Sequence, residues 1–294
     1  KKPPIDEKVL QGFKYLRNII PLFKRYHQVK DHHNRDLHYD QYLSFILLYY
    51  FNPILTSLRG IQKASHLKNV QERLGVKSTS LGSLSEAQGV FDAELLKPLI
   101  SELAKKALPI EKDPKLNMLT QTLTAIDGSL LPALPKMLWA LWLDDNHKAA
   151  KLHLEFDILK GVPERADITH ANANERTNFK NALSADKLYV LDAGYIEYSL
   201  FKDIKDVGSS FVVRLKDNAV WKVKEERTLT NDDLAAGVTK DMVVRLGCKS
   251  RQDDLDFDVR VIEVFHKGDS SRPRSSRVSS KKTFRTTNSD YTFL

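Results

Sequence analysis

The sequence has almost no cysteine: Cys248 is the only one among 294 residues. A single cysteine excludes an internal disulfide, a zinc finger and an iron–sulfur site. Long apolar runs are also missing, because the longest, at 43–51, is far short of the roughly 20 residues that a membrane-spanning helix needs. The N-terminus lacks the apolar segment of a signal peptide. These absences are typical of a cytoplasmic protein that does not associate with a membrane.

Charge, in contrast, is abundant and of unequal sign. Lys and Arg total 46 against 38 Asp and Glu, which gives a net charge of +8. A basic protein favours polyanionic partners, meaning nucleic acid or an anionic membrane surface. From charge alone, a merely basic soluble protein is the alternative. The hydrophobic fraction of 41% is that of a globular protein with a buried core and excludes extensive disorder.

Residues 1–107 are predicted to form a helical region. Over 6–23 the apolar residues recur at spacings of three and four, which places them on one face of a helix. Ser83 and Glu86 have the spacing of a capping box that would open one of these helices. Several short helices in a basic segment fit a helix-turn-helix DNA-binding module, and equally a plain helical bundle. The expected helices are 6–23, 39–52, 58–67, 70–74, 83–91 and 95–103.

After a proline-containing linker, the chain is predicted to change to a mixed α/β core at 118–216. Apolar and polar residues alternate at 152–158, which is the period of a half-exposed strand. A β-rich segment that includes a basic stretch at 266–290 follows over 217–294. The predicted fold class is therefore α/β. The predicted order of the core elements is strand 123–126, strand 137–143, strand 152–158, helix 173–183, strand 188–191, helix 198–204 and strand 210–215.

Two aspartates, Asp127 and Asp192, each end a short apolar strand, and a glycine lies close behind each of them. Neighbouring strands of one sheet would bring these carboxylates together, where they repel one another unless a cation lies between them. Hard oxygen ligands suit Mg²⁺ or Mn²⁺, and a pair of such ions supports phosphodiester cleavage. The pair therefore predicts a nuclease-type metal site. Alone, either aspartate would be an ordinary turn residue, and Asp144–Asp145 is interpreted as part of a polar loop.

The segments around the two aspartates are 123–129 (Leu-Thr-Ala-Ile-Asp-Gly-Ser) and 189–195 (Tyr-Val-Leu-Asp-Ala-Gly-Tyr). Together with supporting segments at 82–87, 151–154 and 211–216, they make the chain similar to a known family from about residue 10 onward. It resembles a DDE transposase of bacterial insertion sequences, family four, with an RNase-H-like catalytic domain.

The resemblance implies DNA cleavage and strand joining at the ends of a mobile element, with Mg²⁺ or Mn²⁺ as the cofactor. Asp127 would ligate both ions and Asp192 one of them, so these are the expected catalytic and metal-binding residues. Tyr195 would lie near the DNA, although a tyrosine packed beneath the sheet is an equally good interpretation. The implied partner is double-stranded DNA, both element ends and target, and the full-length protein is expected to be a homodimer. The 217–294 segment would match the insertion that precedes the family's last catalytic helix.

The sequence departs from the family pattern at two points. Ala193 stands where the family commonly has arginine, and no glutamate after Asp192 fits the family's third acidic residue. We therefore expect a chain truncated before that residue, with impaired catalysis. The alternatives are a non-catalytic DNA-binding remnant, an inhibitor of intact transposase, and a stand-alone nuclease of the same fold.

Overall fold

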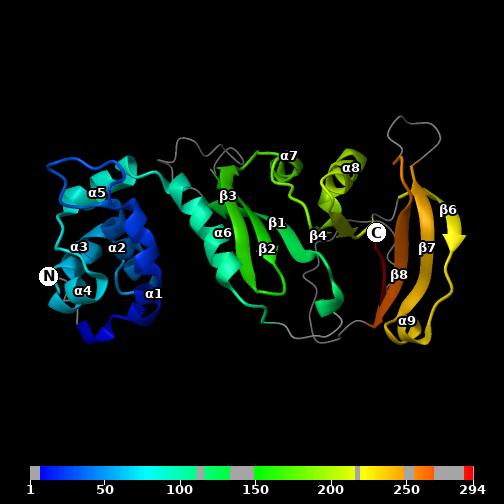
Figure 1. Ribbon diagram of the computed structural model, residues 1–294, viewed down its shortest axis with the longest axis horizontal. Coiled ribbons are helices and arrows are strands. Elements are labelled where there is room, and N and C mark those ends of the chain that lie inside the picture. The colour runs from blue at the N-terminus through cyan, green and yellow to red at the C-terminus, as the bar shows by residue number, and fades with distance from the viewer. Residues whose placement is uncertain are drawn as a thin grey trace, which may run out of the picture. The chain divides into compact units, whose positions relative to one another are not determined.

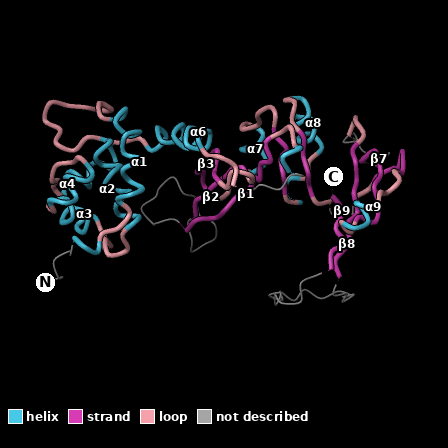
Figure 2. The backbone as a smooth tube through the Cα atoms, turned by 60° about the horizontal axis from the view of Figure 1, so that its bottom comes forward, coloured by secondary structure: helices cyan, strands magenta, loops and turns pink. Residues whose placement is uncertain are grey.

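The computed structural model describes residues 7–110, 116–132, 149–215, 219–247, 255–267 and 288–293. The chain divides into two compact units, Lys1–Leu99 and Ile100–Leu294. Among the described residues, helices make up the first unit and all strands belong to the second (Figure 2). No helix in these ranges combines the length and apolarity needed to cross a membrane.

The first unit is a bundle of short helices around one apolar core. Each α-helix from α1 to α5 contributes at least one side chain that is 1% exposed or less: Leu16, Phe45, Ile61, Val70 and Leu84. The expected helical region is therefore present, and its helices, apart from the start of the first, lie within a few residues of their predicted bounds. The elements are η1 Glu7–Val9, α1 Phe13–Phe23, η2 Lys24–Tyr26, α2 Tyr39–Phe51, α3 Leu58–Ser65, α4 Lys68–Leu74, α5 Leu81–Val90 and η3 Ala93–Leu96. Helix α6, Lys97–Lys106, begins in the first unit and continues into the second.

Two local expectations in this unit are wrong. The predicted helix 6–23 is interrupted at Gly12, which has φ +85°, and α1 begins only after it. A side chain at this position would place its Cβ 2.5 Å from the Phe51 side chain, so the close approach of α2 requires glycine. The capping box does not form at Ser83. Ser80 caps α5 instead, because its hydroxyl accepts a hydrogen bond from the Ser83 backbone N–H at 2.9 Å.

The second unit contains a five-stranded mixed sheet in the order β3-β2-β1-β4-β5 (Figure 1). Strand β1 is antiparallel to β2 and parallel to β4; β3 is antiparallel to β2, and β5 is parallel to β4. The elements are η4 Leu116–Met118, β1 Thr122–Pro132, β2 Ala149–Asp157, β3 Val162–His170, α7 Glu175–Lys180, β4 Lys187–Leu191, η5 Ala193–Tyr195, α8 Tyr198–Asp206 and β5 Ser210–Val213.

The predicted strands and helices that fall on described residues occur in the predicted order, and one further strand, β3, was not predicted. Strand β3 was missed because its residues, which include Pro163, Glu164 and Arg165, lack the apolar pattern of a buried strand. It forms because it pairs with β2 over its length. The predicted strand 137–143 lies outside the described residues.

Helices α7 and α8 cover one face of this sheet. Strand alternation directs Ile126, Leu191 and Val213 to that face, where they join the core formed with the helices. Phe201 of α8 stacks on Phe211 of β5 with ring centroids 4.3 Å apart. Helix α7 follows β3 in the chain, and α8 follows β4 and η5.

A second sheet follows, with four antiparallel strands in the order β6-β7-β8-β9. The fold class is thus confirmed: a helical N-terminal region, a mixed sheet with flanking helices, and a β-rich segment. Most of the predicted basic stretch at 266–290 lies outside the described residues. The elements are β6 Trp221–Glu226, α9 Asn231–Ala235, β7 Val238–Leu246, β8 Val259–Lys267 and β9 Asn288–Phe293.

Candidate active site

Asp127 and Asp192 lie at equivalent positions on the neighbouring strands β1 and β4. Asp192 follows the end of β4 as expected, but Asp127 does not end a short strand, because β1 continues to Pro132 and Asp127 pairs with Leu154 of β2. Strands β1 and β4 are parallel neighbours, and Ala125 pairs with Val190 at the end of their register. Each aspartate is two residues beyond that pair, so both belong to the same side of the sheet. Both side chains are exposed. The structure therefore brings together the two aspartates on adjacent strands, as the sequence predicts, and leaves them open to solvent.

Backbone amides hold one oxygen of each carboxylate. The Asp127 Oδ1 atom accepts a hydrogen bond from the Gly128 N–H at 2.8 Å, and Ser129 Oγ donates to Oδ2 at 3.4 Å. Asp192 caps η5, and its Oδ1 accepts from the Gly194 N–H at 2.8 Å. A Cβ at Gly194 would lie 2.9 Å from that oxygen, so a glycine here lets the carboxylate stay close to the backbone.

This donor set suits a hard divalent cation. Mg²⁺ is commonly bound through one or two carboxylates and retains several waters, and two exposed aspartates with fixed inner oxygens offer that number. Among the described residues, no group of three or more His, Cys, Asp and Glu side chains is arranged to hold a metal ion. The two aspartates therefore form a minimal cation site. In the described parts of the chain, no third acidic side chain joins them as a direct ligand. Asp144–Asp145 lies outside those parts.

Tyr195 is buried, with 3% of its surface exposed. Its ring packs edge-on against Phe179 of α7 with centroids 5.7 Å apart. Burial raises the pKa of the Tyr195 phenol, and the negative charges of Glu175, Asp192 and Asp127 raise it further. The expected DNA contact of Tyr195 stays a prediction, and this packing matches the alternative interpretation, a tyrosine beneath the sheet. Its hydroxyl nevertheless lies within the electrostatic reach of both aspartates.

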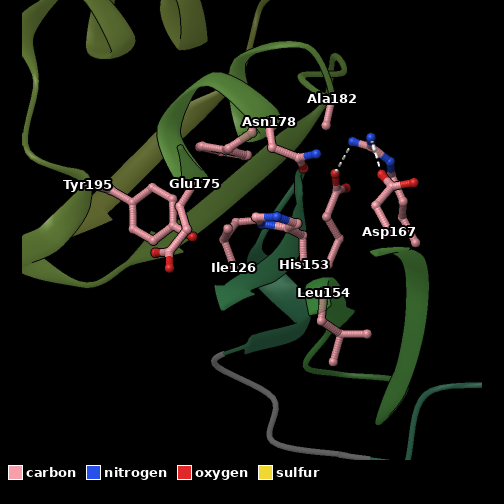
Figure 3. Close-up of a pocket in the computed structure, with 11 residues that line it drawn as sticks. Ile126, His153, Leu154, Asp167, Glu175, Asn178, Ala182 and Tyr195 are labelled. Carbon is pink, nitrogen blue, oxygen red and sulfur yellow. Dashed lines mark hydrogen bonds and ion pairs between the residues drawn. The ribbon is translucent and has the colours of Figure 1, made fainter. Parts of the chain in front are cut away.

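Glu175, at the start of α7, is an acidic residue near this edge that the sequence analysis did not consider. A Cβ at Gly128 would lie 2.8 Å from the Glu175 carboxyl carbon, so this side chain lies against the backbone next to Asp127. Figure 3 shows it beside the Tyr195 ring. The family's third acidic residue is expected after Asp192, and Glu175 precedes it. The sequence signal that could have indicated Glu175 is its place in the first turn of the helix after the third strand, directly behind the N-cap residue Asn174.

Lys151 of β2 fixes the Glu175 carboxylate. Its Nζ lies 3.0 Å from Glu175 Oε1 and also donates to the Ala173 carbonyl at 3.2 Å. The lysine side chain is only 14% exposed and the glutamate 36% exposed. This ion pair therefore connects β2 to the start of α7 and restrains Glu175 near Gly128.

A hollow beneath α7 is lined by polar side chains from β2 and β3 (Figure 3). His153, which faces Gly128 across the β1–β2 pair, has its Nε2 2.8 Å from Thr169 Oγ1. Burial lowers the pKa of His153, and the positive charge of Lys151 lowers it further. A neutral imidazole is therefore favoured at this position, next to the candidate site but on the helix-covered face.

Lys187, at the start of β4, joins two carboxylates on neighbouring strands. Its Nζ lies 3.0 Å from Glu155 Oε2 and 2.8 Å from Glu164 Oε2. Burial lowers the pKa of Lys187, but the hydrogen bonds and charges of Glu164 and Glu155 outweigh this, and the net pKa is raised. This network lies at the opposite end of β4 from Asp192, so it supports the sheet and not the site itself.

Comparison with known proteins identifies the second unit. The family described as "Transposase DDE domain" matches residues 119–290. No curated protein matches the chain. A similar solved structure is the cryo-EM structure of the piggyBac transposase synaptic complex with hairpin DNA, at 11% identity and a TM-score of 0.33. The match covers 88% of this chain and 58% of that one, so the chain spans less than two thirds of that transposase's length.

The matched region includes both aspartates, Tyr195 and the strands that carry them. It extends through β8 and into β9, so it covers both sheets and more than half of the chain. On this match, the chain belongs to the DDE transposase domain family.

Proposed function

We propose that this protein is a transposase that cuts DNA at the ends of an insertion sequence and joins the cut strand to a target, using Mg²⁺ or Mn²⁺. The observation that carries the proposal is the equivalent placement of Asp127 and Asp192 on neighbouring parallel strands. Two exposed carboxylates on one side of a sheet repel each other, and a divalent cation offsets that repulsion. The family supports the reaction class, since DDE domains generally use divalent metals.

Asp127 and Asp192 would hold the cations. Bound there, a pair of divalent ions would activate an attacking oxygen and stabilise the leaving oxygen in phosphodiester cleavage. The backbone N–H groups of Gly128 and Gly194 fix the inner carboxylate oxygens, which directs the remaining lone pairs outward. The chain's own contribution is thus a fixed, exposed pair of anionic ligands at an edge that DNA can approach.

Tyr195 would act beneath the site and not on its surface. Its ring packs between α7 and the sheet, and its hydroxyl lies in the field of the two aspartates. A rigid aromatic at this point restrains η5, the turn that begins at Asp192. We therefore assign Tyr195 to positioning Asp192. A DNA-bound structure in which Tyr195 contacts the DNA would favour the other interpretation.

Double-stranded DNA is the proposed partner. The net charge of +8 provides the electrostatic attraction, and the helical first unit offers the compact helices that a DNA-binding module needs. We further propose that the protein acts as a homodimer, so that two element ends can be cut together. Without a third acidic ligand among the described residues, we expect the 294-residue chain to cleave DNA weakly.

A plasmid nicking and joining assay tests this proposal. Supercoiled DNA and a labelled duplex are incubated with the chain and Mn²⁺, and with the variants Asp127→Asn and Asp192→Asn. Weak nicking and joining that require Mn²⁺ and vanish in both variants are expected. Glu225→Gln, which removes an exposed carboxylate from β6, is the matched control and should leave them unchanged.

The alternatives give different outcomes. Nicking without strand joining would favour a stand-alone nuclease. DNA binding that is equal in the wild type and in Asp127→Asn, with no cleavage by either, would favour a non-catalytic DNA-binding protein. Cleavage that survives both aspartate substitutions would overturn the site.

A further inference from the structure

Glu175 is an acidic side chain outside the aspartate pair whose position points to the same cation. Its carboxyl carbon and Oε1 lie 2.8 and 2.9 Å from the point that a Cβ on Gly128 would occupy. Glycine at this position, immediately after Asp127, therefore leaves a space that the Glu175 carboxyl fills. The contact joins α7 to β1 at the end of the register between β1 and β4.

The local structure holds this carboxylate in place. Asn174 caps α7 by accepting from the Arg176 and Thr177 amides, which fixes the direction of the helix start. Lys151 Nζ holds Oε1 at 3.0 Å with little exposure to solvent. The ion pair offsets part of the negative charge of Glu175 and restrains its carboxylate against Gly128. The Glu175 charge reaches the Tyr195 hydroxyl together with the charges of Asp192 and Asp127.

The geometry excludes one role and leaves another. Gly128 belongs to the helix-covered side of β1 and Asp127 to the other side, so the three carboxylates do not form a ready set of direct ligands. Mg²⁺ retains several of its waters in protein sites. A carboxylate just beyond the direct ligands can accept hydrogen bonds from those waters, as outer partners of metal sites do.

We propose that Glu175 is a third acidic residue of the divalent-cation site, that it acts through water and not as a direct ligand, and that Lys151 positions it. This inference rests on the proposed function, since it requires the cation at Asp127 and Asp192. It assigns to α7, between the two aspartates in sequence, a charge that the sequence analysis sought only after Asp192.

The test is a titration of the 294-residue chain with Mn²⁺, in which electron paramagnetic resonance measures the concentration of free Mn²⁺. Mg²⁺ is then added as a competitor. Glu175→Gln should weaken Mn²⁺ binding by about tenfold, the lower end of the effect of removing an outer partner. Glu175→Asp keeps the charge and should recover part of this loss. Melting curves without metal establish that each variant is folded.

Glu197→Gln is the matched control. Glu197 is 38% exposed and paired with Arg176 at 3.0 Å, close to the exposure and pairing of Glu175, but its charge is not among those that act on Tyr195. Its substitution should change Mn²⁺ affinity by less than about twofold, as for most surface substitutions. An equal loss in Glu175→Gln and Glu197→Gln would mean a general effect of charge and would overturn the inference.

Gly128→Ala provides a second variant that leaves Glu175 in the chain. The added Cβ displaces the Glu175 carboxyl, so Gly128→Ala alone should weaken Mn²⁺ binding. Adding Gly128→Ala to Glu175→Gln should not weaken Mn²⁺ binding further, because the two substitutions act on one contact. Full additivity would contradict the inference. If Asp127→Asn abolishes Mn²⁺ binding and Glu175→Gln leaves it intact, only this inference fails. If neither substitution changes Mn²⁺ binding, the proposed cation site at Asp127 and Asp192 fails as well.

Discussion

Asp127 on β1 and Asp192 after β4 occupy equivalent positions on neighbouring parallel strands, each two residues beyond the paired Ala125 and Val190. This relationship follows from the parallel β1–β4 register, which ends at Ala125 and Val190, although β1 itself continues along β2 to Pro132. It places two like charges in proximity and exposes both to solvent. Such an arrangement costs free energy without a cation and gains free energy with one.

The first prediction concerns metal-dependent stability. Because Mn²⁺ binds the folded site, the wild type should gain about 2.7 kcal/mol of unfolding free energy at a Mn²⁺ concentration 100 times Kd. Asp127→Asn should lose this gain, and without metal it should be at least as stable as the wild type, because one of two like charges is removed. Urea unfolding with Mn²⁺ and with a chelator measures both values. Glu225→Gln is the control and should keep the Mn²⁺-dependent gain in unfolding free energy. An equal gain in Asp127→Asn would contradict the prediction.

The second prediction concerns the support of the sheet. Lys187 is 14% exposed and pairs with Glu155 and Glu164, so Lys187→Met removes the cation that Glu164 pairs with and leaves Glu155 with Arg165 alone. Breaking such a pair should lower the free energy of unfolding by about 3–5 kcal/mol, measured by urea denaturation. Adding Glu164→Gln to Lys187→Met should recover part of the loss, because Glu164 is the carboxylate that Lys187→Met leaves without its cation. A loss below about 1 kcal/mol, the value of an exposed pair, would show that the network is not effectively buried.

The sequence predicted the parts of this molecule that depend on local pattern. Strand 188–191 and the aspartate that follows it are visible because an apolar run ends at a polar residue and a glycine, and α4 ends at Gly75 as expected. The α/β class and the order of core elements follow from the same alternation of periods. These features are encoded within about ten residues of one another.

Features that depend on contacts distant in sequence could not be predicted in this way. Strand β3 is polar and forms only because β2 offers it a partner. The break in the first helix at Gly12 reflects Phe51, a residue of the next helix. Glu175 reaches the site because Gly128 leaves space for it. In each case the deciding partner lies on another element, and a single sequence does not show which elements meet.

The third prediction is a pH dependence. Burial lowers the pKa of His153 in the folded protein below its ordinary value of 6.5, so the unfolded state binds more protons as the pH falls. The stabilising effect of a neutral His153 should therefore be complete above about pH 6.5 and decline progressively below it. The free energy of unfolding, measured in urea from pH 7.5 to 5, should fall less steeply in His153→Gln. The exposed His33→Gln is the control, and an equal change in slope there would contradict the assignment.

The fourth prediction concerns DNA binding by the helical unit. Arg59 and Lys63 are exposed one turn apart on α3, so they present two cations on the same face of the helix. If this face contacts phosphates, replacing both by alanine should weaken DNA binding and lower the slope of log K against log salt by roughly two, about one per contact. Fluorescence anisotropy with a labelled duplex over a series of NaCl concentrations measures that slope. The double substitution of Lys222 and Lys224 on β6 removes the same charge from the second unit. If that control lowers the slope as much, total charge and not the helical unit governs binding, because a phosphate contact depends on where the cation lies.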